Sequence, residues 1–373
     1  MDPNVLRLAM GAAGAGGDEF QLFSWGYNGD GQLGSGTTTD RSSPVQVGSL
    51  KNWSYVSGGQ NICLAIKTDG SLWAWGKNAN GQLGLGNTTY YSSPVQVGAL
   101  TNWLSVSAGH RHCVAVKTDG TLWAWGFNGQ GSVGDGTTTN RSSPVQIGSL
   151  TTWSKVSAGV SGSSLAIKTD GTLWAWGYNQ TGELGLGDTT NYSSPVQVGA
   201  LTNWSKIFAH GPHTHAIKTD GTLWAWGQNA NGELGLGNIT NYSSPVQVGA
   251  LTNWRSVSKD VTSGAGVIAV KTNNTAWAWG SNPYGGLGLG DTTTYSSPVQ
   301  IGALTNWSVI ECDGYSSIGL KTDGTIWTWG YNAYGQLGIS DTSSRLSPVQ
   351  VGSLTTWQSV AAGRLCQYGI KKP

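Results

Sequence analysis

The sequence predicts an all-β protein, a seven-bladed β-propeller of repeats about 50 residues long, and three observations support this. A Trp-Gly pair recurs at steps of 50, 50, 51, 50, 53 and 50 residues, with its tryptophans at Trp25, Trp75, Trp125, Trp176, Trp226, Trp279 and Trp329. Each copy contains four short strand patterns, the number found in a propeller blade. The two chain ends together complete one copy. A fixed period of this length is typical of solenoids, propellers and arrays.

The copy that spans residues 65–106 shows how the pattern produces a blade. Strands are predicted at 65–67, 72–75, 92–97 and 104–106. Asp69-Gly70 supplies the positive φ that a tight hairpin turn needs. Successive residues of a strand face opposite sides, so Leu72 points away from Trp73 and both faces are apolar. Such a sheet must be covered on both faces, as it is when blades stack around an axis.

The chain ends are expected to close the ring. The first copy begins in the middle of a hairpin at 21–25, and the last residues, 368–371, match the strand that precedes this hairpin. Pairing them removes the open sheet edges that a linear array would expose. The expected organisation is therefore an N-terminal arm with a Gly/Ala-rich linker over residues 1–19, followed by one propeller over residues 20–373.

Composition excludes several classes of protein. Charged residues make up 10% of the 373 residues and the net charge is +1, so the clustered Lys and Arg of a nucleic-acid-binding protein are missing. No stretch reaches the roughly 18 apolar residues of a membrane span. The four cysteines lack CxxC spacing and fall in different copies, which favours buried free thiols over disulfides or a zinc site.

The pattern Trp-Gly-x-Asn-x-x-Gly-x-Leu-Gly, seen at 75–84, resembles the repeat of the regulator of chromosome condensation family over residues 20–373. That resemblance implies a propeller, but a fold alone does not give a function. The family's guanine-nucleotide exchange factor needs an inserted wedge and charge, and no copy here has them. Its plant photoreceptor uses Gly-Trp-Arg-His-Thr, where this chain has His110 in place of the key Trp. The use as a binding module remains, similar in type to the family's bacterial β-lactamase inhibitor.

Candidate binding residues lie where the copies differ most, just before the second strand of each blade. Seven equivalent loops must share one face around the channel mouth, and loops on rigid scaffolds often carry binding residues. Neutral drift in solvated loops is the alternative. The candidates are Gln60, Asn61, His110, Arg111, His112, His210, His213, Lys259, Asp260, Tyr315 and Arg364.

A second variable position precedes each Ser-Pro strand and holds only Tyr or Arg. These residue types are enriched at interface hot spots, which predicts a secondary contact surface. Packing over a neighbouring blade is the alternative. The residues are Arg41, Tyr91, Arg141, Tyr192, Tyr242, Tyr295 and Arg345.

Other polar groups are interpreted as structural. An equivalent lysine in every copy, Lys67 for example, is expected to be solvated and paired with a nearby Asp, with an anion-binding rim as the alternative. The two His-x-His pairs, His110 with His112 and His213 with His215, suggest a metal. Their copies are two apart and no further ligands complete a set, so no metal and no cofactor are expected. No catalytic motif is present, and the protein is not expected to be an enzyme.

The function expected is that of a non-enzymatic structural or binding module with a protein partner. Residues 1–12 resemble leaders of structural proteins from tailed phages of marine bacteria. This implies a virion-associated propeller, anchored by its arm, that presents the loop face to neighbouring virion subunits or to a host surface receptor, in a virion or extracellular setting. One alternative is a cytoplasmic, soluble inhibitor or adaptor. Another is a carbohydrate-binding propeller, which predicts exposed Trp or Tyr beside paired carboxylates on the loop face.

Overall fold

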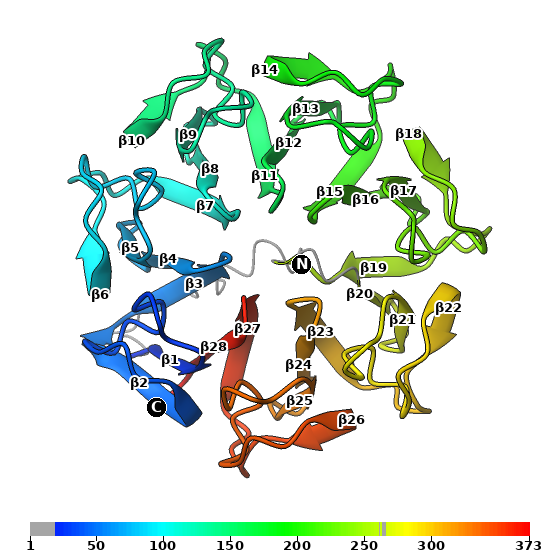
Figure 1. Cartoon of the computed structure of the whole chain (residues 1–373). Coiled ribbons are helices and arrows are strands. Elements are labelled where there is room, and N and C mark those ends of the chain that lie inside the picture. Colours follow the sequence, from blue (N-terminus) through cyan, green and yellow to red (C-terminus); the bar gives the residue numbers. More distant parts are fainter. Residues whose placement is uncertain (1–18, 261, 263–265) are drawn as a thin grey trace.

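The computed structural model describes residues 19–260, 262 and 266–373, and in this part of the chain every regular element is a β-strand. Seven four-stranded antiparallel sheets stand around a central channel, as Figure 1 shows. This confirms the predicted seven-bladed propeller. The arm predicted over residues 1–19 lies almost wholly outside the described residues. Within those residues, no helix has the length and apolar character needed to cross a membrane.

The blades are numbered here along the chain, each from the channel outwards. Blade 1 has β3 (Trp53–Gly58), β4 (Ile62–Lys67), β5 (Leu72–Gly76) and β6 (Tyr91–Gln96); blade 2 has β7 (Trp103–Ala108), β8 (His112–Lys117), β9 (Leu122–Gly126) and β10 (Arg141–Gln146); blade 3 has β11 (Trp153–Ala158), β12 (Ser163–Lys168), β13 (Leu173–Gly177) and β14 (Tyr192–Gln197). Blade 4 has β15 (Trp204–Ala209), β16 (His213–Lys218), β17 (Leu223–Gly227) and β18 (Tyr242–Gln247); blade 5 has β19 (Trp254–Val257), β20 (Gly266–Lys271), β21 (Ala276–Gly280) and β22 (Tyr295–Gln300). Blade 6 has β23 (Trp307–Cys312), β24 (Ser316–Lys321), β25 (Ile326–Gly330) and β26 (Arg345–Gln350); blade 7 has β27 (Trp357–Gly363), β28 (Cys366–Lys371), β1 (Gln21–Gly26) and β2 (Arg41–Lys51).

Blade 7 closes the ring with both chain ends. Strand β1 pairs antiparallel with β28 over its whole length, from Gln21 opposite Lys371 to Gly26 opposite Cys366. The N-terminal strand thus occupies the third position of a blade whose first two strands come from the C-terminal end. The predicted closure is confirmed, and the order of the sheet is β2-β1-β28-β27.

The repeated tryptophans hold neighbouring blades together. The Trp of each Trp-Gly pair is fully buried, and its indole N–H donates to a backbone carbonyl in the glycine-rich loop of the preceding blade. Trp226, for example, donates to Glu183 O at 2.9 Å, and Trp75 donates to Gln32 O at 2.8 Å. The following glycine has a positive φ, and a Cβ at Gly227 would lie 2.5 Å from Pro212 O. The Trp therefore serves the contact between blades, whereas the Gly permits the close approach of the loop before β16 within its own blade.

The repeated lysines correct the expectation that they are solvated partners of Asp. Lys117 is 3% exposed, and its Nζ lies 3.5 Å from the ring centroid of Trp123 and 4.7 Å from that of Trp103. Equivalent stacks occur at Lys67, Lys168, Lys218, Lys271 and Lys321. A buried ammonium group over aromatic faces gains a cation–π interaction, which the alternating Trp pattern made available.

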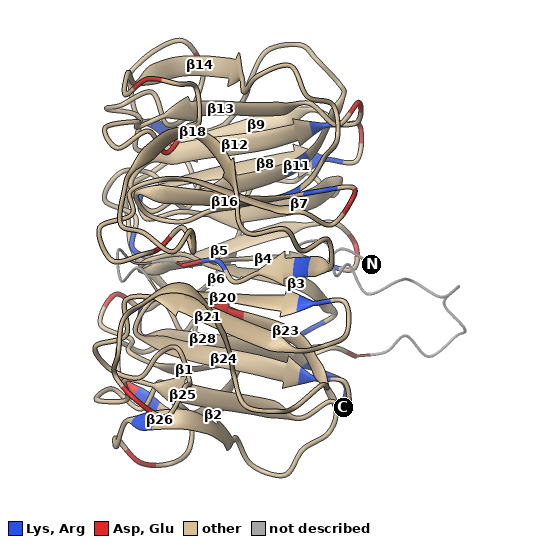
Figure 2. Cartoon of the chain, turned by 90° about the vertical axis from the view of Figure 1, so that its right-hand side faces the viewer, with Lys and Arg blue, Asp and Glu red and all other residues tan. Residues whose placement is uncertain are grey.

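Each blade has two distinct ends. We call one the turn end, because it carries the turns between second and third strands, such as 68–71, and the connections to the next blade. The other is the loop end, which carries the loops between first and second strands, such as 59–61, and the glycine-rich loops between third and fourth strands. In the side view, blue segments mark the lysine-bearing strand ends along the right-hand rim, which is the turn end (Figure 2).

Candidate functional site

The loop end forms a linked ring of loops around the channel mouth. The backbone N–H of Arg364 donates to Gly59 O at 3.2 Å, and that of Gln60 donates to Gly109 O at 3.3 Å. In the same way, Val160 N of blade 3 donates to His210 O of blade 4 at 2.7 Å. Hydrogen bonds between blades therefore hold loops of variable sequence in fixed positions.

The candidate residues of this face divide by exposure. Arg111 is exposed, and the half-buried candidates are Gln60, His110, Lys259, Tyr315 and Arg364. The buried candidates are Asn61, His112, His210, His213 and Asp260. Asn61 donates to Asp30 at 2.6 Å and His112 bonds to Ser164 at 2.9 Å. These two buried side chains therefore hold the loops of neighbouring blades in position.

A continuous row of aromatic side chains crosses blades 5 to 7 at the loop end. Neighbouring ring centroids lie 5.5, 4.8, 6.3 and 5.1 Å apart along what we call the tyrosine row: Tyr315, Tyr284, Tyr331, Tyr334 and Tyr27. Tyr284 is 44% exposed and Tyr334 is 37% exposed. Of these five residues, sequence reasoning identified only Tyr315. A signal was available, because Tyr27 and Tyr331 both follow Trp-Gly in adjacent blades.

Positive charge continues the tyrosine row towards blades 1 and 2. Tyr27 N donates to Leu365 O at 2.8 Å, and because Leu365 directly follows Arg364 in the chain, this bond brings Tyr27 near Arg364 in space. Burial lowers the pKa of His110, and together with the charges of Arg111, Lys77 and Arg364 it brings that pKa to about 4. His110 is therefore neutral at physiological pH, and Arg111 contacts the Phe127 ring at 5.9 Å.

The channel itself is crossed by one lysine. Lys259 Nζ donates to Ser107 Oγ at 3.0 Å and to Ala108 O, so the side chain reaches from blade 5 to blade 2. Its backbone N–H donates to Glu311 at 3.0 Å. Burial lowers the pKa of Lys259 to about 8 and raises that of Glu311 to about 7. The cavity here has a volume of about 80 Å³, well below the roughly 300–1,000 Å³ of small-molecule pockets.

The predicted secondary contact residues are all half-buried at the start of the outer strands. Tyr192 donates its hydroxyl to Asp188 at 2.8 Å, and Arg141 donates to Asp135 at 2.7 Å. Tyr91 and Tyr295 each pack against the cores on both sides of their blade. The hydrogen bonds hold Tyr192 and Arg141 to the glycine-rich loops of their own blades, and packing makes Tyr91 and Tyr295 part of the blade interfaces. The contact surface formed by the seven residues stays a prediction.

The histidines do not gather as the His-x-His pairs suggested. His112 lies in blade 2, whereas His210, His213 and His215 form what we call the histidine cluster in blade 4, with ligating atoms within 4.8 Å of one another. Sequence reasoning missed the place of His210 in this cluster. Backbone bonding of His210 N to His213 O at 3.1 Å closes a tight turn, which brings His210 back over the strand. All four cysteines are buried as free thiols, as expected.

Comparison with known proteins gives a consistent match along the chain. The family model for the regulator of chromosome condensation (RCC1) repeat matches residues 21–66, 69–116, 119–166, 170–217, 220–269, 273–320 and 323–366. Protein RCC2 of Mus musculus is 42% identical over 60 residues, a match that spans 15% of this chain and only 12% of that protein.

Solved structures share the architecture. Human WBSCR16 superposes with a TM-score of 0.82 at 20% identity, covering 95% of this chain and 99% of that one. Prp20p from Saccharomyces cerevisiae, described with its binding properties to Gsp1p and histones, gives a TM-score of 0.84 at 16% identity and covers 95% and 92%. Identities this low show the fold alone.

Proposed function

The chain belongs to the regulator of chromosome condensation (RCC1) repeat family, and on that premise we propose that it is a non-enzymatic propeller whose loop end binds another protein. The observation that carries the proposal is the tyrosine row together with the adjoining Arg364 and Arg111. Tyr and Arg dominate interface hot spots because they combine large apolar area with hydrogen-bonding groups. Hydrophobic residues that are exposed singly need no explanation, but two exposed tyrosines in one connected row indicate a contact surface.

Rigidity of the surrounding loops supports the same function. The hydrogen bonds between neighbouring loops, such as Gln60 N to Gly109 O, keep the backbone of the loop end in place before a partner arrives. A preorganised surface loses less conformational entropy on binding. The protein partners named for the yeast relative support a protein ligand as a class, and this chain's own partner is a separate question.

Affinity capture with matched variants tests the proposal. The full chain is used as bait with lysate of its source, and captured proteins are titrated against it. In the test variant, Tyr284→Ala and Tyr334→Ala shorten the tyrosine row. The control variant, Leu150→Ser with Leu201→Ser, changes two exposed residues at the turn end. We expect at least a tenfold loss of affinity for the test variant and none for the control. Equal affinity of both variants would contradict the proposal.

We further propose a virion setting, in which the N-terminal arm anchors the propeller and the loop end meets a host receptor or a neighbouring subunit. The support is the similarity of residues 1–12 to phage structural leaders. Density-gradient fractionation tests it: the chain should sediment with large particles and lose this property when residues 1–19 are deleted. A chain that stays at the top of the gradient would favour the cytoplasmic adaptor.

A glycan is the second candidate ligand, because exposed tyrosines on the loop end are one of the two features, together with paired carboxylates, that the carbohydrate-binding alternative predicts. Asp30 is near this surface and accepts a hydrogen bond from Asn61 at 2.6 Å. Aromatic faces stack on sugar rings through the same apolar area that serves protein contacts. Binding to a glycan array that is lost in the Tyr284→Ala, Tyr334→Ala variant would favour this candidate over a protein partner.

A further inference from the structure

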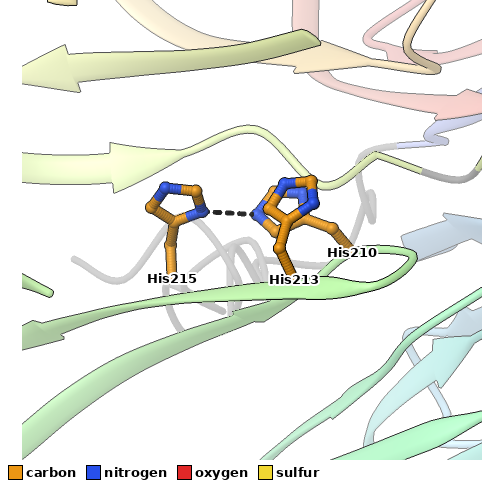
Figure 3. Close-up of side chains that lie close together, drawn as sticks. All are labelled: His210, His213 and His215. Atoms are coloured by element: carbon orange, nitrogen blue, oxygen red, sulfur yellow. Dashed lines mark hydrogen bonds between the residues drawn. The ribbon is translucent and has the colours of Figure 1, made fainter. Parts of the chain in front are cut away.

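Three imidazoles converge in the histidine cluster. His213 and His215 project from the same side of β16, because side chains two apart in a strand share a face. His210 turns back over them: its ring is parallel to that of His213, with centroids 4.5 Å apart and 12° between the planes. Figure 3 shows the three side chains rising together from the β15–β16 hairpin. All three are fully buried.

The hydrogen bonds of the cluster define where its protons lie. His210 Nδ1 accepts from Asp260 N at 3.1 Å, so a neutral His210 carries its proton on Nε2. That Nε2 lies 3.1 Å from His215 Nδ1 and donates to it, which places the proton of His215 on its own Nε2. Among the described residues, neither His215 Nε2 nor either nitrogen of His213 has a hydrogen-bond partner.

Unsatisfied nitrogens at this depth require an explanation. Buried polar side-chain atoms nearly always have a partner, and an exception points to a missing water or ion. Here three such nitrogens belong to one cluster rather than to separate sites. His213 therefore has both ring nitrogens available as ligands, next to the His210 Nε2 and His215 Nδ1 that already face each other at 3.1 Å.

We propose that His210, His213 and His215 together bind one divalent transition-metal ion of the Zn²⁺, Co²⁺ or Ni²⁺ type. Imidazole nitrogen suits these ions, and three histidines form a known ligand set with a fourth position for water. The 3.1 Å between His210 Nε2 and His215 Nδ1 is close to the roughly 3.3 Å between two nitrogens on a tetrahedral ion at about 2.0–2.1 Å. A nitrogen of His213 lies within 4.8 Å of these two atoms, so a small rotation of its ring would complete the set.

Burial keeps the ligands in the form that a metal needs. It lowers the pKa of His213 to about 3 and that of His210 and His215 well below the ordinary value. Neutral imidazole is the ligating form, so binding at neutral pH does not have to displace a proton from an imidazolium ion.

Binding would also act on the channel mouth. A metal on His210 Nε2 moves the ring proton to Nδ1, which can then no longer accept from Asp260 N. The backbone at Asp260 must find another partner, and Asp260 directly follows Lys259, the residue that crosses the channel. The proposed site is thus coupled to the loop end, although it does not depend on what the loop end binds.

Titration of untagged protein with Co²⁺ tests the proposal. We expect one Co²⁺ per chain, a visible absorption band typical of tetrahedral nitrogen coordination, a raised thermal midpoint, and reversal by a chelator or by competing Zn²⁺. Absence of saturable binding by the wild-type chain would overturn the proposal. A thiolate-to-cobalt charge-transfer band would also overturn it, since it would assign the ion to cysteine.

Matched variants locate the ion. His213→Gln and His215→Gln should each weaken Co²⁺ binding at least tenfold. His112→Gln is the control, because His112 occupies in blade 2 the register position of His213 in blade 4 and lies outside the cluster. Unchanged binding in both cluster variants, or equal loss in the control, would contradict the assignment. If a cluster variant fails to fold, the wild-type stoichiometry and spectrum still decide the question.

Discussion

The framework between the blades and the loop end of the same blades differ in how uniform they are. In the framework, every Trp-Gly tryptophan is fully buried and donates to the preceding blade, with distances between 2.7 and 3.0 Å. At the loop end, the position that Gln32 holds in blade 7 is held by Ser132 in blade 2 and by Glu183 in blade 3. Positions that are equal in all copies carry the fold, and positions that differ are free to carry a task.

Among the substitutions considered, removal of one framework tryptophan is expected to cause the largest loss of stability. Trp226→Ala leaves a cavity and removes one of the two hydrogen bonds that Glu183 O accepts, the other coming from the Thr214 hydroxyl, so we expect the free energy of unfolding to fall by about 3–5 kcal/mol. Trp224, on the same strand β17 but half-buried, is the matched control and should cost less when changed to Ala. Urea unfolding measures both. Equal losses would show that burial between blades does not decide the contribution.

Replacing the Glu183 side chain should raise the stability of the protein, whereas replacing a framework side chain should lower it. Burial raises the pKa of Glu183 to about 7, and its Oε1 has no described hydrogen-bond partner. The protonated carboxyl stabilises the folded state below pH 4.5, and this stability is lost as the pH rises through about 7. Glu183→Gln should therefore add about 1–3 kcal/mol at pH 8.5 and little at pH 4.5.

The equivalent change in blade 4 is the control for Glu183. Glu233 accepts from Asn231 through both oxygens, at 2.7 and 3.2 Å, so Glu233→Gln should change stability less. Thermal midpoints of both variants across this pH range give the comparison. A gain at Glu183 that does not depend on pH would rule out ionisation as its cause.

Lysine stacking should make a smaller contribution that follows its geometry. Lys218 Nζ lies 3.5 Å from the Trp224 centroid, whereas Lys67 Nζ lies 4.7 Å from that of Trp73. We expect Lys218→Ala to cost about 1–2 kcal/mol through lost packing and cation–π attraction, and Lys67→Ala to cost less. Urea midpoints measure the difference, and the reverse order would contradict the stacking account.

The loop-end substitutions should have the smallest effect on stability. Tyr284 and Tyr334 are exposed, and both contact the ring of Tyr331 in the tyrosine row. Tyr284→Ala with Tyr334→Ala should change the free energy of unfolding by no more than about 0.5 kcal/mol per residue. A large loss in urea unfolding would place the tyrosine row in the framework and remove the separation between the two regions.

The sequence predicted the framework because repetition averages out local ambiguity. Seven copies of one pattern gave the strands, and five of them gave an Asp-Gly turn. The predicted closure by residues 21–25 with 368–371 is confirmed by the pairing of β1 with β28. The burial of the lysines was not predicted, because the sequence shows an Asp close to most of these lysines along the chain but not which side chains pack against them in space. Stacking became visible only once Trp103 and Trp123 were placed on either side of Lys117.

The loop end was predicted as a region but not residue by residue. Variation between copies marked the face correctly, yet it did not separate Arg111, which is exposed, from His112, which is buried one residue later. The tyrosine row joins residues of three blades, so its members are far apart in the chain. The histidine cluster needed the tight turn at His210 to bring a third imidazole onto β16.

Hydrogen exchange of the propeller, free and bound to its captured partner, tests the central claim most directly, because it reports on both regions in one experiment. The account predicts slower exchange at the loop end, in loops such as 109–111 and in the glycine-rich loops that carry Tyr284, Tyr331 and Tyr334, with turn-end segments such as 68–71 unchanged. Protection confined to the turn end would contradict it, since the binding surface would then lie on the uniform side of the ring.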